Sequence, residues 1–434
     1  MKCLKEEDTW IKNGLIRQPV NNQPYRLSTF VVRFPVNDGF LLFNTVTGCI
    51  LFFENEQDFH NSKETLIQNW FLIPSENFDE HLWVDYLRDK KREIKGGEIK
   101  SYLIMTTMGC NARCFYCYEK GRKPISMTEH TAIAVSNMII ADSSSKKVRI
   151  SWFGGEPLVN SKVINIICKN LEKHNCAYSS NIISNGLLFS EDLIDQAINQ
   201  WHLQRVQITI DGTEKNYLSI KAYKHGHGDE FQKVMHNIEN LLKNNISVSI
   251  RLNQNYGNTN DLIILSEYIK DKFAKYNTLS VYNRLLFDEK ITDDLYIAYF
   301  KLKHKLQKLH LSKPYYGEAL RSNQCMADSD TSLVITPNGK IGKCEHFSES
   351  NFIGSIYDKE FDQQMISQFK ETYEKLPSCN TCAFYPRCVR LKMCPSPIDV
   401  CTDFIRADYL DDIHYMMNAC YKKYKVSLGA MPRT

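Results

Sequence analysis

The 434-residue sequence lacks the long apolar segments that a membrane protein needs. No run approaches the roughly 18 apolar residues that span a bilayer. The first residues, MKCLKEEDTW, are not followed by the apolar core of a signal peptide. A net charge of +4 is too small to indicate a nucleic-acid surface. Internal repeats and low-complexity segments are also missing. We therefore expect a cytoplasmic globular protein of about three domains, with no membrane or nucleic-acid partner.

Cysteine is abundant, but the 15 cysteines do not suit a disulfide scaffold in a cytoplasmic protein. Five are scattered, and for each of them a small buried apolar side chain is the simplest interpretation: Cys3, Cys49, Cys168, Cys176 and Cys420. The other ten are clustered, three at positions 110–117 and seven between Cys325 and Cys401. This clustering predicts metal binding.

Residues 1–97 are predicted to form a small α+β unit. Three β-prone runs, 25–34, 39–48 and 49–58, are separated by turn sequences at Asn37-Asp38-Gly39 and Thr47-Gly48. Helical patterns follow near 63–71 and 77–94. A basic stretch then predicts a linker, with its break at Gly96-Gly97.

Residues 98–312 alternate between apolar runs and amphipathic stretches. We expect strands near 101–106, 147–153, 178–184, 204–211, 246–253 and 278–286, with helices near 128–141, 160–174, 190–200, 229–244 and 260–273. Six β/α repeats predict an α/β fold with a parallel sheet, open or closed into a partial (β/α)6 barrel. Ligands of such folds bind at the carboxyl ends of the strands.

Residues 313–434 form the third predicted domain. A polar helix near 292–310 leads to it, and a last helix is expected at about 402–424. Between them the sequence is rich in turns and cysteines, so metals would have to hold it together.

The first cysteine cluster, GCNARCFYCYEKG, follows the first strand of the repeats, where chemistry is expected. Its cysteines, Cys110, Cys114 and Cys117, stand at C-x3-C-x2-C. Three thiolates do not complete a structural zinc site, which takes four protein ligands. An iron–sulfur cube held by three cysteines leaves one iron free to bind a substrate or cofactor. Three nearby thiols without a metal are the plain alternative.

This motif, with Tyr116 before its last cysteine, resembles the hallmark of radical S-adenosylmethionine (SAM) enzymes. The resemblance implies that Cys110, Cys114 and Cys117 hold a [4Fe–4S] cluster whose free iron binds the methionine part of SAM. It further implies that the reduced cluster cleaves SAM to a 5′-deoxyadenosyl radical, which abstracts a hydrogen from the substrate.

The ends of the following strands carry further residues that resemble SAM contacts of this family. Gly154-Gly155-Glu156-Pro157 is similar to the motif at the SAM amino group, where Gly155 would let the backbone approach and Glu156 would accept from the ammonium. The other candidates are Ser184, Asn185, Asp211 and Arg251, the last as a partner of the SAM carboxylate. A tight turn at 154–157 and a buried structural role for Asp211 or Arg251 are the alternatives. The family's arginine ten positions after the aspartate is Lys221 here, so its role is not carried over.

The second cysteine cluster resembles the SPASM extension of radical SAM enzymes, which holds two auxiliary [4Fe–4S] clusters. Its pattern is Cys325, Gly339-x4-Cys344, Cys379-x2-Cys382-x5-Cys388, Cys394 and Cys401. Cys394 arrives after five residues, where three are usual. The resemblance implies an outer cluster on Cys379, Cys382, Cys388 and Cys401, and an inner one on Cys325, Cys344 and Cys394. The fourth inner position would be open to substrate or filled by Asp328, Glu345 or His346. A zinc ribbon is the alternative for the region, and a polar surface role for His346.

The first unit is similar to the winged-helix peptide-recognition element of enzymes that modify ribosomally made peptides. Such a unit binds a leader peptide as an extra strand at a sheet edge. A domain that only covers the barrel is the alternative.

Together these resemblances imply a radical SAM/SPASM peptide maturase of the sactisynthase or ranthipeptide type. It would use SAM and three [4Fe–4S] clusters, take electrons from a flavodoxin or ferredoxin, and install a thioether in a precursor peptide. Carbon–carbon or carbon–oxygen cross-linking, epimerisation and formylglycine formation by a sulfatase-type maturase are the enzymatic alternatives. A non-enzymatic iron–sulfur carrier would need neither the SAM motif nor a barrel.

Overall fold

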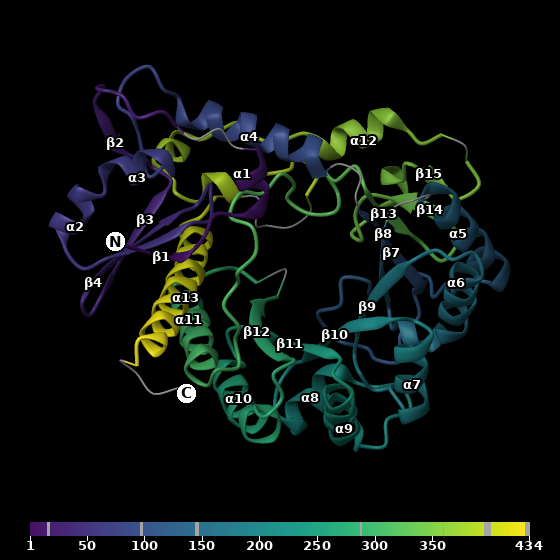
Figure 1. Cartoon of the computed structure of the whole chain (residues 1–434). Helices are drawn as coiled ribbons and strands as arrows, with labels where there is room; N and C mark the ends of the chain where they lie inside the picture. The colour runs from purple at the N-terminus through teal and green to yellow at the C-terminus, as the bar shows by residue number, and fades with distance from the viewer. Residues whose placement is uncertain are drawn as a thin grey trace.

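The computed structural model describes residues 1–14, 18–95, 99–143, 147–286, 289–358, 360–394 and 401–429. In Figure 1 the chain begins in a small sheet on one side, crosses to a large curved sheet on the other, and returns to the small sheet through a long helix. The expected break at Gly96-Gly97 lies outside the described residues.

The small N-terminal sheet is antiparallel, with strand order β1 (Lys2–Lys5), β5 (Ile50–Phe53), β4 (Gly39–Asn44) and β3 (Val31–Val36). Both of its faces are covered, which explains the unbroken apolar runs of β4 and β5. Leu41 and Phe52 pack on helix α13 (Asp403–Ser427), whereas Leu42 and Phe53 pack on Leu66 from the opposite side.

The elements around this sheet differ in part from the sequence prediction. The run 25–34 is two strands, β2 (Tyr25–Leu27) and β3, because the Glu80 carboxylate accepts from the Ser28 hydroxyl (2.8 Å) and the Thr29 amide (3.2 Å) between them. The helix expected near 63–71 is shorter. The bounds of the remaining elements are α1 (Thr9–Gly14), α2 (Glu56–Asn61), α3 (Lys63–Gln68), β6 (Leu72–Pro74) and α4 (Glu80–Lys95). Strands β1 and β6 were not predicted.

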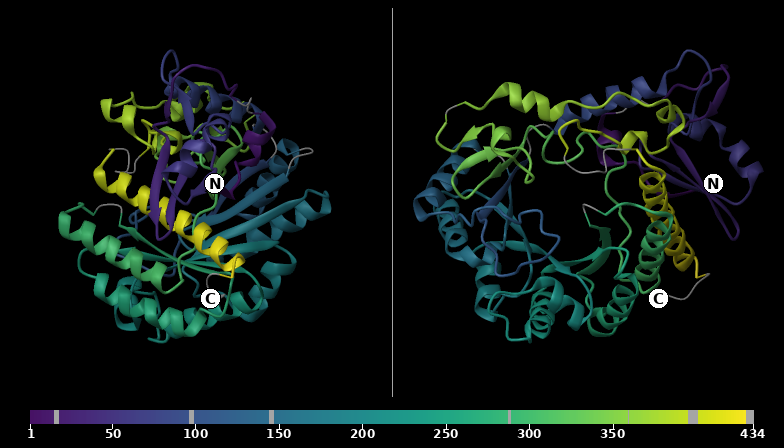
Figure 2. Two further views of the ribbon diagram at one scale, coloured as in Figure 1. Left: turned by 60° about the vertical axis from the view of Figure 1, so that its left-hand side comes forward. Right: turned by 180° about the vertical axis from the view of Figure 1, so that it is seen from behind.

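The large sheet contains the six expected parallel strands in chain order. They are β7 (Ile99–Thr107), β8 (Lys147–Gly154), β9 (Tyr178–Ser184), β10 (Leu203–Ile210), β11 (Ser247–Gln254) and β12 (Leu279–Leu285). Each pairs in parallel with its neighbour, and β12 is one edge of the sheet. The six strands therefore form an open arc, which Figure 2 shows from two further sides.

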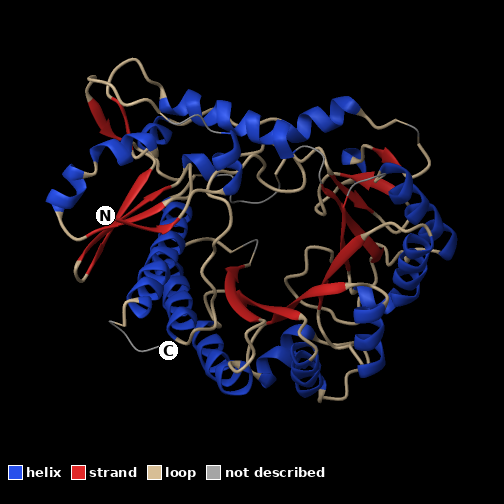
Figure 3. Cartoon of the chain, viewed as in Figure 1, coloured by secondary structure: helices blue, strands red, loops and turns tan. Residues whose placement is uncertain are grey.

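Helices cover the convex face of this arc (Figure 3). They are α5 (Glu129–Asp142), α6 (Ser161–Lys173), α7 (Glu191–Asn199), α9 (Glu230–Lys243), α10 (Thr259–Phe273) and α11 (Asp293–Lys308). The main core lies between these helices and the sheet and includes Trp152 and Trp201. A further helix after β10, α8 (Glu214–Lys221), was not predicted.

The sheet continues beyond β7 into the cysteine-rich region. Strand β13 (Ser332–Ile335) pairs in parallel with β7, and β14 (Lys340–Gly342) and β15 (Gly354–Ser355) follow in antiparallel. One mixed sheet thus crosses the predicted boundary at 312/313. The short elements after β14 are η2 (Glu349–Asn351), α12 (Gln363–Lys370), η3 (Pro377–Thr381) and η4 (Tyr385–Arg387).

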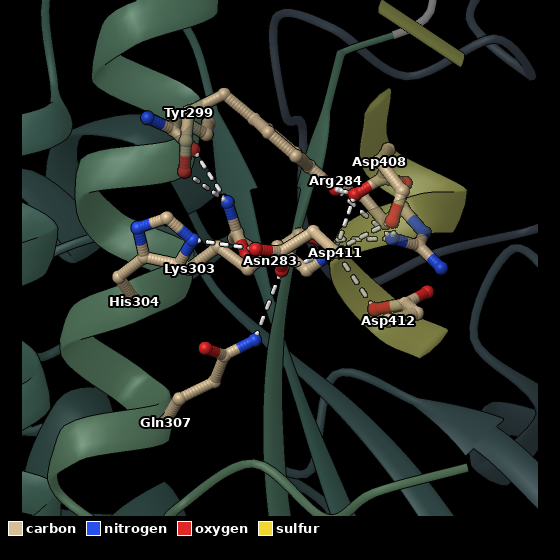
Figure 4. Close-up of polar contacts among 10 residues, drawn as sticks. Asn283, Arg284, Tyr299, Lys303, His304, Gln307, Asp408, Asp411 and Asp412 are labelled. Atoms are coloured by element: carbon tan, nitrogen blue, oxygen red, sulfur yellow. Dashed lines mark hydrogen bonds and ion pairs between the residues drawn. The ribbon is translucent and has the colours of Figure 1, made fainter. Parts of the chain in front are cut away.

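The final helix is attached to the large sheet by a polar cluster (Figure 4). The buried Lys303 of α11 contacts Asp408 at 2.6 Å, Asp412 at 2.7 Å and Asp411 at 3.2 Å, all on α13. The Tyr299 hydroxyl donates to Asp408 at 3.0 Å. Helix α13 therefore links α11, which follows the edge strand β12, to the small N-terminal sheet. None of the helices in the described ranges has an apolar stretch long enough to cross a membrane.

Candidate active site

The three cysteines of the first cluster lie in the loop between β7 and α5. The loop is held at its start by the Gly109 amide, which donates to the Thr107 hydroxyl at 2.9 Å. All three thiols are half-buried. Burial raises the pKa of the Cys110 thiol to about 11, and the nearby negative groups of Cys114 and Cys117 add to the rise. The loop therefore gathers its three sulfur atoms at the carboxyl edge of the sheet.

The glycines at the end of β8 allow the chain to pack on this loop. A Cβ at Gly154, whose φ is +126°, would lie 2.1 Å from the Thr107 carbonyl oxygen. A Cβ at Gly155 would lie 2.4 Å from the Gly109 carbonyl oxygen. We expected Gly155 to admit the methionine of SAM. In this structure, the atoms it admits belong to the cysteine loop.

Glu156 is fully buried, and its carboxylate accepts three hydrogen bonds from other residues of the protein. Its carboxylate accepts from the Asn185 amide at 2.8 Å, the Ser184 hydroxyl at 2.9 Å and the Leu158 amide at 3.2 Å. Burial raises its pKa to about 7, although these hydrogen bonds oppose the rise. Glu156 thus ties the end of β8 to the end of β9, and its contact with SAM remains a prediction. Pro157 opens the short helix η1 (Pro157–Asn160) that this carboxylate caps.

Asn185 reaches the cysteine loop, where its side-chain amide donates to Asn111 Oδ1 at 2.6 Å. The Nδ2 group of Asn111 is buried, and among the described residues it has no hydrogen-bond partner. A buried donor without an acceptor is costly. Because Asn111 is next to Cys110, this amide could donate to an acceptor atom of a bound cofactor. The sequence analysis did not identify Asn111.

Tyr116, Asp211 and Lys221 form a buried polar group behind the cysteines. The Tyr116 hydroxyl donates to Asp211 Oδ1 at 2.8 Å, and Lys221 Nζ lies 2.9 Å from Asp211 Oδ2. Burial alone would lower the pKa of Lys221, but Asp211 and then Tyr116 outweigh it and raise that pKa well above its usual value. Lys221 therefore holds Tyr116 and Asp211 in place, the two residues of this group that were predicted to bind the cofactor. The sequence had left the role of Lys221 open.

Arg251 lies apart from these contacts, on β11. It is half-buried, and its Nε donates to Asn253 Oδ1 at 2.9 Å. No hydrogen bond between described residues joins it to the other predicted SAM contacts. Its pairing with the SAM carboxylate remains a prediction.

The seven C-terminal cysteines fall into two groups by their electrostatic contacts. Cys325, Cys344 and Cys394 form one, since burial and then nearby carboxylates raise the pKa of Cys325 to about 11, with Cys394 adding to the rise. Cys379, Cys382, Cys388 and Cys401 form the other, in which burial raises the pKa of Cys388 to about 11, and Cys382 and Cys401 raise it further. The resemblance assigns the same residues to the inner and outer ligand sets, and that assignment remains a prediction.

The three proposed fourth ligands of the inner set differ in their contacts. The Asp328 carboxylate accepts from the amides of Gln324 (3.0 Å) and Cys325 (3.1 Å). Glu345 lies close enough to raise the pKa of Cys344, after burial. The His346 ring lies 4.1 Å from the ring of Tyr118, which belongs to the first cysteine loop. The inner set and that loop are therefore neighbours.

Within the described parts of the chain, no three His, Cys, Asp or Glu side chains are close enough to share a single metal ion. An iron–sulfur cube does not require this, because each cysteine binds a different iron.

The N-terminal unit grips the loop of the outer set. The His81 ring donates to the Cys379 carbonyl at 2.9 Å, and Arg88 donates to the Cys388 carbonyl at 3.1 Å. The Thr45 hydroxyl donates to the Ala383 carbonyl at 2.8 Å. Three side chains of the first hundred residues, two of them on α4, thus hold a segment about three hundred residues later in the chain.

Residues 104–261 match the family model described as the radical SAM superfamily. This part of the chain is a radical SAM domain. A domain of this family implies SAM and one [4Fe–4S] cluster as cofactors. The domain contains β8 to β11 and the whole cysteine loop, whose donor set and unpaired Asn111 amide fit those cofactors.

Parts of the chain are similar in sequence to other proteins. GTP 3′,8-cyclases of two Clostridium perfringens strains are 30% identical over 193 residues, which are 43% of this chain and 54% of theirs. The chain spans about half the length of these relatives. Among solved structures, anSMEcpe with bound AdoMet and Kp18Cys peptide has a TM-score of 0.56 at 16% identity, over 75% of this chain and 98% of that one. This likeness extends the shared fold beyond the radical SAM domain.

Proposed function

We propose that this radical SAM enzyme is a peptide maturase that cross-links a ribosomally made precursor peptide, with a thioether as the favoured bond. The observation that carries the proposal is the division of ten cysteines into three separate groups, one in the radical SAM domain and two beyond it. The two C-terminal cysteine sets would hold two further clusters, which could take up the surplus electron of a carbon radical in the substrate.

The residues present match the roles this chemistry needs. Cys110, Cys114 and Cys117 would hold the cluster that, when bound, supplies the electron for cleaving SAM to a 5′-deoxyadenosyl radical. Asn111 and Asn185 would orient SAM, and the buried Glu156 would keep the two strand ends together beneath it. The inner and outer cysteine sets would hold the auxiliary clusters of a SPASM-type domain at 313–434, and a flavodoxin or ferredoxin would donate electrons.

The N-terminal unit, residues 1–97, would bind the leader of the precursor. Strand β3 is an edge of the small sheet, because it pairs only with β4 among the described strands. A leader peptide would extend the sheet at this edge by main-chain hydrogen bonds. Arg88 of α4, in the same unit, donates a hydrogen bond to the Cys388 carbonyl. The unit that binds the leader would therefore also support the loop of the outer cysteine set.

The likeness to anSMEcpe supports a peptide substrate, because structures of that protein hold AdoMet together with Cp18Cys and Kp18Cys peptides. The thioether is favoured over carbon–carbon or carbon–oxygen bonds, epimerisation and formylglycine because the inner set has three cysteines. An open iron there would bind a soft substrate thiolate.

The test is anaerobic incubation of the reconstituted enzyme with a cysteine-containing precursor encoded beside it, SAM and a reductant. Thioether formation removes two hydrogens, so the peptide should lose about 2 Da, and fragmentation should place the bond between a cysteine and a carbon. A precursor with serine in place of that cysteine is the control. SAM cleavage without any change in peptide mass would reject the maturase proposal, and loss of about 2 Da from the serine precursor would reject the thioether.

A further inference from the structure

The concave face of the large sheet is built from alternate residues of its six parallel strands. On β8, Val148 and Ile150 belong to the core beneath the helices, so Arg149 between them points to the other side. On β10, Val206 is likewise in the core and Arg205 faces away from it. In the two views of Figure 2, the helices stay on the outside of the arc. Arg149 and Arg205 are both exposed on the uncovered side.

This face carries charge of one sign only. The six strands contain no aspartate or glutamate, and they present three arginines to the concave side: Arg149, Arg205 and Arg251. A fourth, Arg284, lies on the edge strand β12 and turns to Tyr299 and Asp408 (Figure 4). Toward β12 their uncharged neighbours are polar, since the Tyr282 hydroxyl donates to Gln207 at 2.7 Å across the intervening strand. Toward β7 the same face is apolar, where Leu103, Met105 and Phe153 pack together. Uncompensated charge of one sign on a concave surface attracts an oppositely charged ligand.

Most of this charge has no partner within the described residues. No carboxylate pairs with Arg149, Arg205 or Arg251, and Arg284 lies 4.0 Å from Asp408. A further cation, Lys313, is close enough to Arg205 to have its pKa lowered, first by burial and then by that arginine. The face therefore holds a positive potential that the folded chain itself does not neutralise.

The arginines are spread along the sheet. Arg205 stands beside Ser247 of β11, and Arg251 lies four residues further along that strand, about 13 Å away at about 3.3 Å per residue. Arg284 stands beside Asn253, two residues further still. At the other end, Arg149 lines a cavity of about 290 Å³ together with Cys325 and Met326. A row of this length suits an extended chain with several negative groups better than one compact anion.

We propose that the concave face binds an acidic segment of the peptide substrate, whose aspartate or glutamate side chains pair with this row of arginines. The inference rests on the proposed function and adds to it the charge of the segment that is modified. The row ends at the cavity beside Cys325, so an acidic segment held along it would pass the inner cysteine set.

The test uses fluorescein-labelled peptides of about ten residues that alternate glycine with glutamate, or glycine with glutamine. Their binding to reconstituted enzyme is measured by anisotropy at low and high salt. The glutamate peptide should bind at least about tenfold more tightly at low salt, and the difference should shrink as salt screens the charges. The double variant Arg149→Gln/Arg205→Gln should lose about tenfold in affinity for the glutamate peptide and keep its SAM cleavage.

The matched control is Lys169→Gln/Lys173→Gln, which removes the same charge from exposed positions of helix α6 on the convex side. It should bind the glutamate peptide as the wild type does. Equal binding of the two peptides, or an equal loss in the control, would overturn the proposal. Tighter, arginine-dependent binding of GTP would assign the face to a nucleotide instead. Failure of the peptide-mass assay alongside arginine-dependent peptide binding would reject the proposed reaction and leave this binding site intact.

Discussion

Replacing Lys221 by methionine should destabilise the radical SAM domain more than most single changes. Lys221 and Asp211 are 3% and 1% exposed and lie 2.9 Å apart, so the substitution leaves a buried carboxylate without its cation. Breaking a buried ion pair by removing one partner costs about 3–5 kcal/mol. The hydrogen bond from Tyr116 to Asp211, worth about 1.5–3 kcal/mol, remains and limits the loss.

Urea unfolding, followed by the fluorescence of the buried Trp152 and Trp201, measures this loss. With a slope of about 3 kcal/mol per molar urea, the midpoint should fall by about 1–1.7 M. Asp211→Asn should cost a similar amount, and the double variant Asp211→Asn/Lys221→Met clearly less than the sum. Lys221→Arg keeps the ion pair and should be the mildest change at this position.

Two results would refute this reasoning. A wild-type midpoint for Lys221→Met would show that the pair contributes little. Losses that add fully in the double variant would show that Lys221 acts independently of Asp211. If the pair also positions the cysteine loop through Tyr116, Lys221→Met should take up less iron at the first cysteine set, while the C-terminal sets fill normally.

The same structure leads us to expect four further outcomes. Anaerobic reconstitution should load about 12 irons per chain, and about eight when Cys110, Cys114 and Cys117 are alanine, whereas tightly bound zinc would contradict the auxiliary clusters. Glu156→Gln should weaken SAM binding about 10- to 150-fold if the carboxylate meets the ammonium, and unchanged affinity would leave it a structural role. Because burial raises the folded pKa of Glu156 to about 7, its contribution to stability should be complete below about pH 4.5. It should be lost as pH rises to about 7, a change of about 3 kcal/mol that the glutamine variant lacks. Arg88→Met should speed the release of about four irons to a chelator by loosening the outer loop, and Lys90→Met, on the exposed side of the same helix, should not.

The sequence predicted the large sheet well, because most of its strands have apolar residues at alternate positions and are bounded by turns or helices. It placed β9 at the observed residues and the other five strands to within about two. It missed α8, a short helix in the loop after β10. The run 25–34 was predicted as one strand because the contact that divides it comes from Glu80, more than fifty residues later.

For the site, the spacing of the cysteines in the sequence was enough to group them. The sequence around them could not show which residues each neighbouring side chain contacts. Gly155 and Glu156 were expected to face a cofactor, and in the structure they meet the cysteine loop and the end of β9. Lys221 was set aside because an arginine is usual at its position. Its carboxylate partner, Asp211, was identified as a candidate SAM contact, with a buried structural role as the alternative. These contacts depend on the meeting of strand ends that are distant in sequence.

The grip of α4 on the outer cysteine loop has a consequence for exchanging parts between enzymes of this kind. An N-terminal unit grafted from a relative would have to replace the contacts that His81 and Arg88 make here, and would pack on the apolar side of α13. The donor unit would have to supply matching hydrogen-bond donors for the carbonyls of Cys379 and Cys388, or the graft would change the surroundings of the outer cysteine set. Chimaeras should therefore succeed when the α4 surface and the loop of residues 377–388 are transferred together.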